Sequence, residues 1–483
     1  MIRRHLICGL VTSLLLSLPS FATNPVFNIR DYGAIGDGVT IDSNAAASGG
    51  GTVWFPAGIY ASYSIRLKSN ITLHLDAGAT LLAAYRSPDG KQGYDPAEPN
   101  VWGDEHRYQD FGHSHWRNSL IWGENLENVS IIGSGRIDGR ALRGARQVIL
   151  PGESFAQSGE RVRDSDPGVG NKAIALKGCR NVTLRDFSVF RGGHFALLAT
   201  GVDNLTIDNV RVDTNRDGFD IDCCRNVRIS NCHVNSPHDD AIVFKSSYAL
   251  GEARATENVT LTNCQVSGYG IGSLLDGTFD RSVERAPDGD GPTGRIKFGT
   301  ESNGGFKNIV ISNCVFDRCR GLALEIVDGG VMEDVSITNI TMRDIVNCPL
   351  FIRLGNRGRG PDGTPVGSIR RINISDINVY DADSRYASLI SGLPGHNIED
   401  VRLSNIRILY KGGFTMAQVA AQPAELINDF FSRRESPGSA GPREPFNVPE
   451  HEKGYPEPSI FGLLPAYGLY VRHAENIKVK DVE

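Results

Sequence analysis

The sequence predicts an all-β fold, a single-stranded parallel β-helix in which the strands of each coil stack on those of the next. Three observations predict it: one short phrase returns along the chain, each copy alternates apolar and polar residues, and the spacing between copies varies. Alternation with period two is typical of strands. A repeat with a fixed core and variable spacing is typical of a solenoid that carries loops on one side.

The repeat is clearest in the middle of the chain, with copies starting at Asn181, Asn204, Asn226, Asn258 and Asn308. Weaker copies start at Asn70, Asn128, Asp334, Ile372, Asp400 and Asn476. Each copy is rich in Val, Ile and Thr, and a single strand could not pair its own backbone groups, so coils are expected to stack. We expect the leading Asn to be a turn residue whose amide bonds the backbone or the Asn of the next coil.

Composition is ordinary for a soluble globular chain of 483 residues, with 40% hydrophobic and 22% charged residues. A solenoid can hold this length in one domain, although length alone would favour several. The formal net charge of -6 argues against general nucleic-acid binding, which usually requires a basic patch. An acidic polymer would instead need a local basic cleft.

The first residues predict a signal peptide over 1–22, because Arg3 and Arg4 precede an apolar run that ends in Ser20-Phe21-Ala22. The run is short for a membrane span, and the alternative, a membrane anchor, is less favoured. We therefore expect an exported protein, secreted or periplasmic, with no membrane partner, and a β-helix domain over 23–483. Loop insertions are expected near 84–117, 271–293 and 411–467, and 42–49 is too short for an end-capping helix.

Eight cysteines remain outside the predicted signal peptide. An even number in an exported chain is compatible with disulfides. However, Cys232, Cys264 and Cys314 recur in the same frame of the repeat, which is typical of small apolar residues stacked in a solenoid interior. Buried thiols are slightly favoured over bridges.

Three aspartates carry the strongest chemical signal. Asp217 lies 22 and 23 residues before Asp239 and Asp240, which equals one coil of the repeat. Residues one coil apart lie above each other, so the three carboxylates should converge, and like charges then raise one another's pKa. Glycoside hydrolysis needs one protonated and one ionised carboxyl. A calcium site or a turn-forming Asp pair is the alternative that these residues alone leave open.

The segments NRDGFDID and PHDDAIVFKS resemble the Asn-x-Asp and Asp-Asp motifs of glycoside hydrolase family 28, the polygalacturonases and rhamnogalacturonan hydrolases. The resemblance extends from the GDG turn near Asp37 to the last coil and implies a right-handed, pectin-lyase-like β-helix. It implies Asp239 as the general acid and Asp217 with Asp240 as the pair that activates water. It further implies inversion, with an acid-to-base gap of about 6.5–9.5 Å. Asn215 would orient the three aspartates.

The residues that should bind the sugar depart from that family. Its Gly-His-Gly coil falls either at Tyr269, by distance, or at Gly294 or Arg295, by local frame, and its Arg-x-Lys coil then has Glu325 in a cation's place. Cations that could replace it are Arg295, Lys297 and Arg353. Further candidates for substrate binding are His194, His238 and Lys245. His113 and His115 with Trp116 indicate a sugar-stacking rim, and a metal site there is disfavoured because no third ligand is evident.

The function predicted from these patterns is hydrolysis of an acidic plant-cell-wall polysaccharide, or of its oligosaccharides, by a monomer that needs no cofactor and no metal. Two alternatives stay open. One is calcium-dependent elimination, as in pectate lyases, and the other is a non-catalytic carbohydrate-binding β-helix. The insertions 84–117 and 411–467 could close one end of the cleft, which weakly favours exo action.

Overall fold

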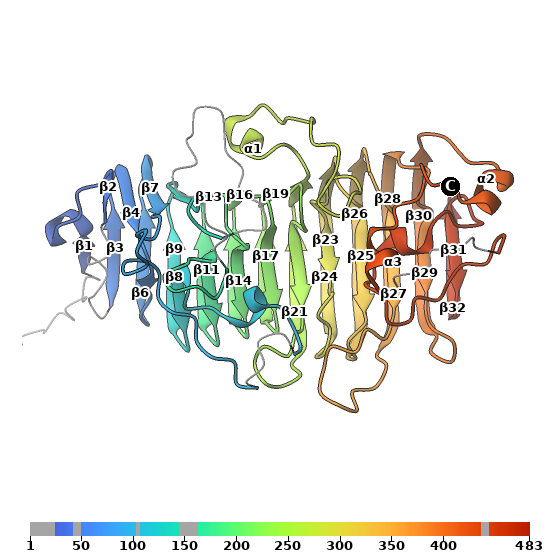
Figure 1. The fold of residues 1–483 in the computed structure, drawn as a ribbon, viewed down its shortest axis with the longest axis horizontal. Helices are drawn as coiled ribbons and strands as arrows, with labels where there is room; N and C mark the ends of the chain where they lie inside the picture. Colours follow the sequence, from blue (N-terminus) through green and yellow to red (C-terminus); the bar gives the residue numbers. More distant parts are fainter. Residues whose placement is uncertain (1–24, 42–49, 103–106, 144–162, 436–443) are drawn as a thin grey trace, which may run out of the picture.

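The computed structural model describes residues 25–41, 50–102, 107–143, 163–435 and 444–483. These residues form one elongated solenoid whose coils follow the chain from end to end (Figure 1). Every named strand pair is parallel, and each strand pairs with its counterpart in the neighbouring coil. The predicted parallel β-helix is confirmed. The predicted signal peptide over 1–22 and the short segment 42–49 lie outside the described residues.

One sheet of eleven strands contributes a single strand per coil and forms the face that carries the site. Its strands, in order, are β5 (Ile65–Arg66), β8 (Ser119–Glu124), β11 (Lys172–Lys177), β14 (Phe195–Thr200), β17 (Asp217–Asp222), β20 (Ile242–Lys245), β23 (Ile296–Phe298), β25 (Leu322–Ile326), β27 (Leu350–Leu354), β29 (Ser388–Ser391) and β31 (Leu469–Arg472).

The remaining strands form a second, bent sheet of twenty-one strands. They are β1 (Val26–Asn28), β2 (Asp37–Ile41), β3 (Gly51–Phe55), β4 (Gly58–Ser62), β6 (Ile71–Leu75), β7 (Ala79–Ala83), β9 (Glu127–Ile132), β10 (Arg136–Asp138), β12 (Arg180–Arg185), β13 (Ser188–Phe190), β15 (Asp203–Asp208), β16 (Arg211–Asp213), β18 (Arg225–Ser230), β19 (His233–Asn235), β21 (Thr256–Thr262), β22 (Gln265–Ser267), β24 (Phe306–Asp317), β26 (Val331–Arg343), β28 (Ser368–Ala382), β30 (Ile398–Tyr410) and β32 (Ala474–Val482).

The repeated Asn residues turn the chain into this second sheet. They adopt left-handed backbone conformations, with φ of 54° at Asn181 and 57° at Asn258, which Asn tolerates better than other residues with a side chain. Their amides form a ladder along the helix: Asn181 donates to Asn128 at 3.0 Å, and Asn308 donates to Asn258 at 2.8 Å. The prediction of a turn residue that bonds the next coil is confirmed.

The alternating apolar residues of each coil point inward and stack into columns. Leu205, Val227, Val259 and Ile309 form one such column and are at most 1% exposed. The eight cysteines within the described residues are free and buried in the same packing, so the expectation of buried thiols is confirmed.

Three insertions depart from the regular coils and lie between strands. The N-terminal insertion, residues 84–117, joins β7 to β8 and contains η3 (Phe111–Ser114). The central insertion, residues 271–293, joins β22 to β23 and contains α1 (Ser273–Asp276). The C-terminal insertion, residues 411–467, joins β30 to β31 and contains α2 (Met416–Ala421), α3 (Phe430–Glu435) and η4 (Pro458–Phe461). An initial short helix, η1 (Ile29–Tyr32), follows β1. No helix within the described ranges is long and apolar enough to span a membrane.

Candidate active site

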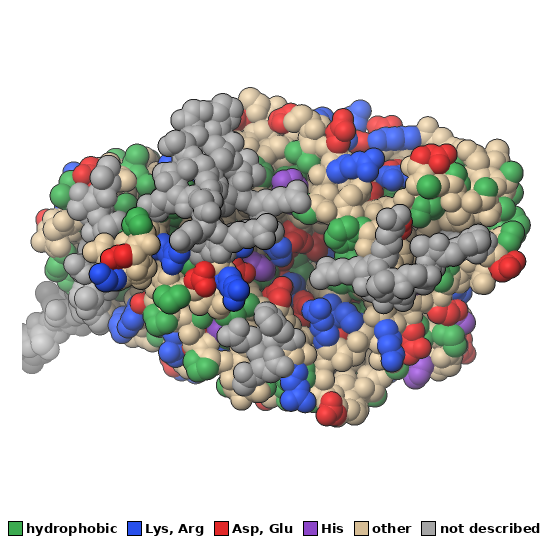
Figure 2. Space-filling view, viewed as in Figure 1, with side chains coloured by type: hydrophobic (Ala, Val, Ile, Leu, Met, Phe, Trp, Pro, Cys, Tyr) green, Lys and Arg blue, Asp and Glu red, His purple; other side chains and the backbone are tan. Residues whose placement is uncertain are grey.

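A cleft of about 610 Å³ opens over β17, β20 and β23. Figure 2 shows the corresponding hollow in the middle of one face, where acidic, basic and His side chains gather. The cleft is lined by all three predicted catalytic aspartates, Asp217, Asp239 and Asp240. The parallel register explains their convergence, because Phe219 pairs with Ile242, so that Asp217 and Asp240 occupy equivalent positions in consecutive coils.

The three carboxylates are drawn together by one backbone group. The Asp240 N–H donates to Asp217 Oδ1 and to Asp239 Oδ1, both at 3.1 Å. As a result, one oxygen from each aspartate lies within 4.8 Å of the others. This spacing between nearest oxygens is shorter than the gap of about 6.5–9.5 Å that inversion leads one to expect between carboxyl groups.

Two cations hold Asp240. Arg295 Nε donates to Asp240 Oδ1 at 2.7 Å, and Lys297 Nζ lies 3.4 Å from Asp240 Oδ2. Burial alone would raise the pKa of Asp240, but Lys297 and Arg295 outweigh it and lower the pKa to about 2. Asp240 is therefore ionised. Because both of its oxygens are in contact with cations, a calcium ion at the three aspartates would meet two positive charges.

Asp217 has the opposite setting. Its carboxyl is buried beside Asp239 and Asp220, and desolvation followed by these like charges raises its pKa well above the ordinary value. Lys245, whose Nζ lies 3.7 Å from Asp217 Oδ2, opposes this shift. The site therefore holds one carboxyl that favours its proton and one that has lost it, as acid–base hydrolysis requires.

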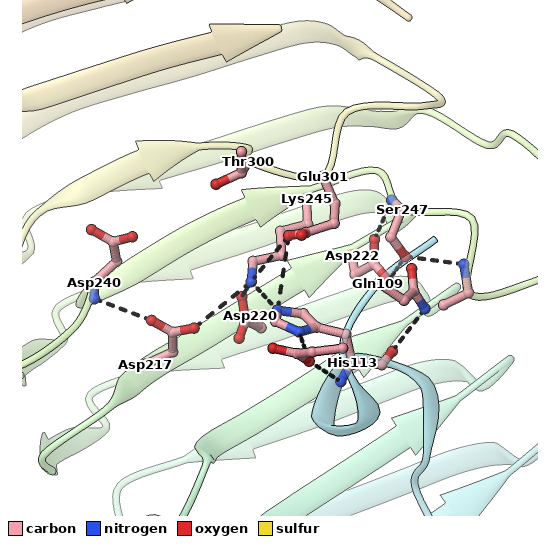
Figure 3. A network of polar contacts seen from close by, with 12 residues as sticks. Gln109, His113, Asp217, Asp220, Asp222, Asp240, Lys245, Ser247, Thr300 and Glu301 are labelled. Carbon is pink, nitrogen blue, oxygen red and sulfur yellow. Dashed lines mark hydrogen bonds and ion pairs between the residues drawn. The ribbon is translucent and has the colours of Figure 1, made fainter. Parts of the chain in front are cut away.

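Lys245 is the centre of a buried polar network (Figure 3). Its Nζ lies 3.3 Å from Asp220 and 3.5 Å from Glu301, and it also contacts His113 from the N-terminal insertion. The Lys245 side chain is only 6% exposed. Lys245, predicted to bind substrate, lines the cleft but is already shared among these groups, so its contacts position Asp217.

The other predicted binding residues fall into two groups. Asn215 and His238 line the cleft, as do Arg295 and Lys297. His194, Tyr269 and Arg353 lie outside its lining. The Tyr269 hydroxyl donates to Asp317, and Arg353 donates to backbone carbonyls of the C-terminal insertion.

His194 lies against Arg216, with its Nε2 3.3 Å from the guanidinium. The sugar-stacking rim predicted at His115 and Trp116 is wrong, because these residues are 1% and 2% exposed. Trp116 packs against the outer face of β14, where its indole N–H donates to Thr200. Trp116 therefore serves to pack the N-terminal insertion on the sheet and does not form a sugar-binding surface.

Register decides between the two alignments of the missing His. Ile242 pairs with Ile296 and Val243 with Lys297, so Gly294 and Arg295 lie on the coil after the Asp pair. This register agrees with the local-frame alignment, and Tyr269 belongs to the loop that precedes the central insertion. On the following coil, Glu325 lies 3.6 Å from Lys297, which places an acid beside the cation that binds Asp240.

Several cleft residues were not predicted, and five of them come from the C-terminal insertion. Glu457 is 1% exposed and accepts from Arg295 at 2.9 Å and from Arg320 at 2.7 Å. Tyr455 stacks on Phe431, with ring centroids 4.6 Å apart. The sequence around these residues is rich in Pro and charged residues and lacks the repeat of the coils. No sequence pattern therefore linked them to the aspartates. Glu457 directly precedes η4.

Replacing Glu325 by Gln should change how stability depends on pH. Desolvation raises the pKa of buried Glu325 to about 8, whereas the unfolded residue titrates near 4.5. Between about pH 4.5 and pH 8, the folded state therefore keeps a proton on Glu325 that the unfolded state has lost. The contribution of Glu325 to stability is complete below about pH 4.5 and is lost as pH rises through 8. We expect the Tm of Glu325→Gln, relative to wild type, to rise between pH 5 and pH 8.

Thermal unfolding followed by circular dichroism across this range measures the effect. Glu475→Gln, at an exposed glutamate on β32, is the matched control and should show a constant difference. A constant difference for Glu325→Gln as well would contradict the prediction.

The comparisons with known proteins agree with this geometry. Residues 123–282 match the family model "Right handed beta helix region". A "Probable polygalacturonase" of Vitis vinifera is 24% identical over 79% of this chain and 74% of the relative. An "Exo-poly-alpha-D-galacturonosidase" of Dickeya chrysanthemi is 26% identical over 61% of this chain and 41% of its own length.

Solved structures share the fold. A hyperthermoactive exopolygalacturonase from Thermotoga maritima superposes with a TM-score of 0.61 at 21% identity, covering 80% of this chain and 87% of that one. A family 28 exopolygalacturonase from Yersinia enterocolitica gives 0.59 at 22% identity, covering 80% and 72%. Given the related sequences, this fold and the aspartates that its coils bring together, the chain is a glycoside hydrolase that is similar to the polygalacturonases of family 28.

Proposed function

We propose that this enzyme hydrolyses α-glycosidic bonds in a pectic polysaccharide, galacturonan or rhamnogalacturonan, through Asp217, Asp239 and Asp240, after export from the cell. The observation that carries the proposal is the contrast within this trio. Asp240 is held ionised by Arg295 and Lys297, while Asp217, one coil away, is buried among like charges. The relatives named polygalacturonase support the choice of substrate class.

The proposed roles follow from charge and access. Asp240 is ionised at ordinary pH and acts as the base that takes a proton from water. Asp239 is the most exposed of the three, at 29% of its side chain, and acts as the acid that protonates the leaving oxygen. Asp217 accepts a hydrogen bond from the Asp240 N–H and is the second carboxyl of the pair that activates water. Because its raised pKa keeps it protonated, Asp217 positions the water, and the proton that the water releases goes to Asp240.

Insertions pack on the eleven-stranded sheet on both sides of the cleft, which supports action on chain ends or short oligosaccharides. Phe461 and Ile460 of the C-terminal insertion pack on Phe351 of β27 and on neighbouring residues of β25 and β29. Trp116 of the N-terminal insertion packs on Phe195 of β14. The insertions thus cover outward residues of these flanking strands, which limits the surface of the eleven-stranded sheet that a long polymer could follow.

Product analysis tests this function. We expect reducing ends to appear from polygalacturonate or from rhamnogalacturonan, with monomer or one short oligomer as the early product and a slow fall in viscosity. Proton NMR of the fresh product separates inversion, which the likeness to family 28 leads us to expect, from retention, which carboxyl groups about 5–5.5 Å apart would favour. Random fragments of many lengths would contradict action on chain ends, and a calcium-dependent rise in ultraviolet absorbance would instead establish elimination. Binding of the oligomers without turnover would establish a non-catalytic protein.

A further inference from the structure

The cations around the cleft differ in what they are free to bind. Among the described residues that line it, eight are Lys or Arg, and six of these are paired with carboxylates of the protein. The six are Arg216, Lys245, Arg295, Lys297, Arg320 and Arg357. A buried, paired cation could bind a substrate carboxylate only by giving up its protein partner. The six therefore neutralise the protein's own acids.

The two remaining cations are Arg359 and Lys453. Both are exposed, both line the cleft, and neither side chain has a carboxylate partner among the residues that the structure describes. An Arg in this situation can bind a carboxylate through two parallel hydrogen bonds, and a Lys can add a point charge.

The backbones that carry these two cations are fixed and joined. The Arg359 N–H donates to Asp328 at 2.9 Å, and the Arg359 carbonyl accepts from Asn303 at 2.8 Å. Beside them, Asn356 N–H donates to the Glu452 carbonyl at 2.7 Å, and its side-chain amide donates to the Glu452 carboxylate at 2.9 Å. These bonds tie the segment that bears Arg359 to the residue that precedes Lys453, so both cations belong to one wall.

The same wall supplies aromatic area. Tyr455 follows Lys453 by two residues and stacks on Phe431 with an interplanar angle of 10°, and both line the cleft with Phe430. Phe430 is 41% exposed. A pyranose ring has an apolar C–H face and a polar edge, so a wall with aromatic rings beside cations fits an acidic sugar better than a neutral or fully apolar ligand.

We propose that Arg359 and Lys453 are the specificity-determining residues that bind the carboxylate of a uronate unit of the substrate. This inference rests on the proposed function, since it names the acidic sugar that the same cleft receives. On this proposal, the substrate carboxylate does not bind at the coil of Glu325, where the protein itself carries an acidic side chain. It binds instead at a wall built from the residues after β27 and from the C-terminal insertion.

The test compares Arg359→Gln, Lys453→Gln and the double variant with Lys478→Gln, a matched control at an exposed lysine on β32. The probes are an α-1,4-linked galacturonate trimer and its neutral methyl ester. Calorimetry on Asp239→Asn backgrounds gives Kd, and hydrolysis by otherwise unaltered enzymes gives KM and kcat.

We expect each cleft variant to weaken binding of the acidic trimer roughly 10- to 100-fold, as expected for loss of a charge-assisted hydrogen bond. The Kd for the methyl ester and the kcat for the trimer should change less than about twofold, and Arg359→Lys should recover part of the affinity. Unaltered Kd values in both single variants and the double variant would overturn the proposal while leaving the hydrolase intact. A wild-type enzyme that neither binds nor cleaves galacturonate chains would overturn the proposed function as well.

Discussion

Asp240→Asn should lower kcat for a pectic oligosaccharide by roughly 10²- to 10⁴-fold, the range typical of general acid–base groups. The variant keeps the shape of the side chain but removes the charge that Arg295 and Lys297 hold in place. Without an ionised carboxylate, water loses its base whatever the leaving group. The deficit should therefore be equally large on an aryl galacturonide, whose activated leaving group needs no protonation.

Asp239→Asn distinguishes the acid from the base. Loss of the proton donor should slow hydrolysis of the oligosaccharide by a similar factor but leave much of the activity on the aryl galacturonide. Initial rates on both substrates measure the contrast, with circular dichroism as the check on folding. If Asp239→Asn retains full activity on the oligosaccharide, the assignment of the acid is wrong. If Asp217→Asn instead shows this contrast, Asp217 is the donor, as its raised pKa would permit.

Glu457→Gln should lower the free energy of unfolding by about 3–5 kcal/mol, the cost typical of removing one partner from a buried ion pair. Glu457 lies between two arginines, Arg295 and Arg320, whose side chains are 3% and 2% exposed. Gln would leave both without their shared anion in a site from which water is largely excluded. Arg295 would also lose the bidentate contact that orients it toward Asp240, so activity should fall together with stability.

Denaturant unfolding measures this loss, and Glu450→Gln is the matched control. Glu450 belongs to the same insertion and pairs with Arg472, but its side chain is 39% exposed, so the effect there should stay within about 1 kcal/mol. Equal effects at the two positions would show that burial between Arg295 and Arg320 confers no special stability on Glu457.

Local sequence was sufficient wherever the solenoid repeats. The Asn at the start of each copy marked the left-handed turn, and the spacing of one coil brought Asp217 beside Asp239 and Asp240. Even the alignment of Arg295 after the Asp pair could be found, because the flanking coil keeps the repeat's frame. These inferences succeed because stacked coils convert separation in sequence directly into position in space.

The insertions could not be read in the same way. His115 and Trp116 looked like a sugar-binding rim but are buried, with Trp116 packing the N-terminal insertion on the sheet, and Arg353 looked like a free cation but is bonded to the C-terminal insertion. Nothing in the sequence pairs Glu457 with Arg295, which lies 162 residues away in the chain. A loop without a period places its side chains through contacts that are non-local.

The sequence by itself therefore determined the β-helix, its turn residues and the convergence of the three aspartates, since all three depend on a repeat whose register is fixed by backbone pairing. Only the tertiary structure decided the opposite pKa shifts of Asp217 and Asp240, the packing of the insertions beside the cleft and which cations, among the residues described, lack a carboxylate partner. These depend on which groups surround a buried charge, and the C-terminal insertion supplies several of those groups after folding back over the eleven-stranded sheet (Figure 1).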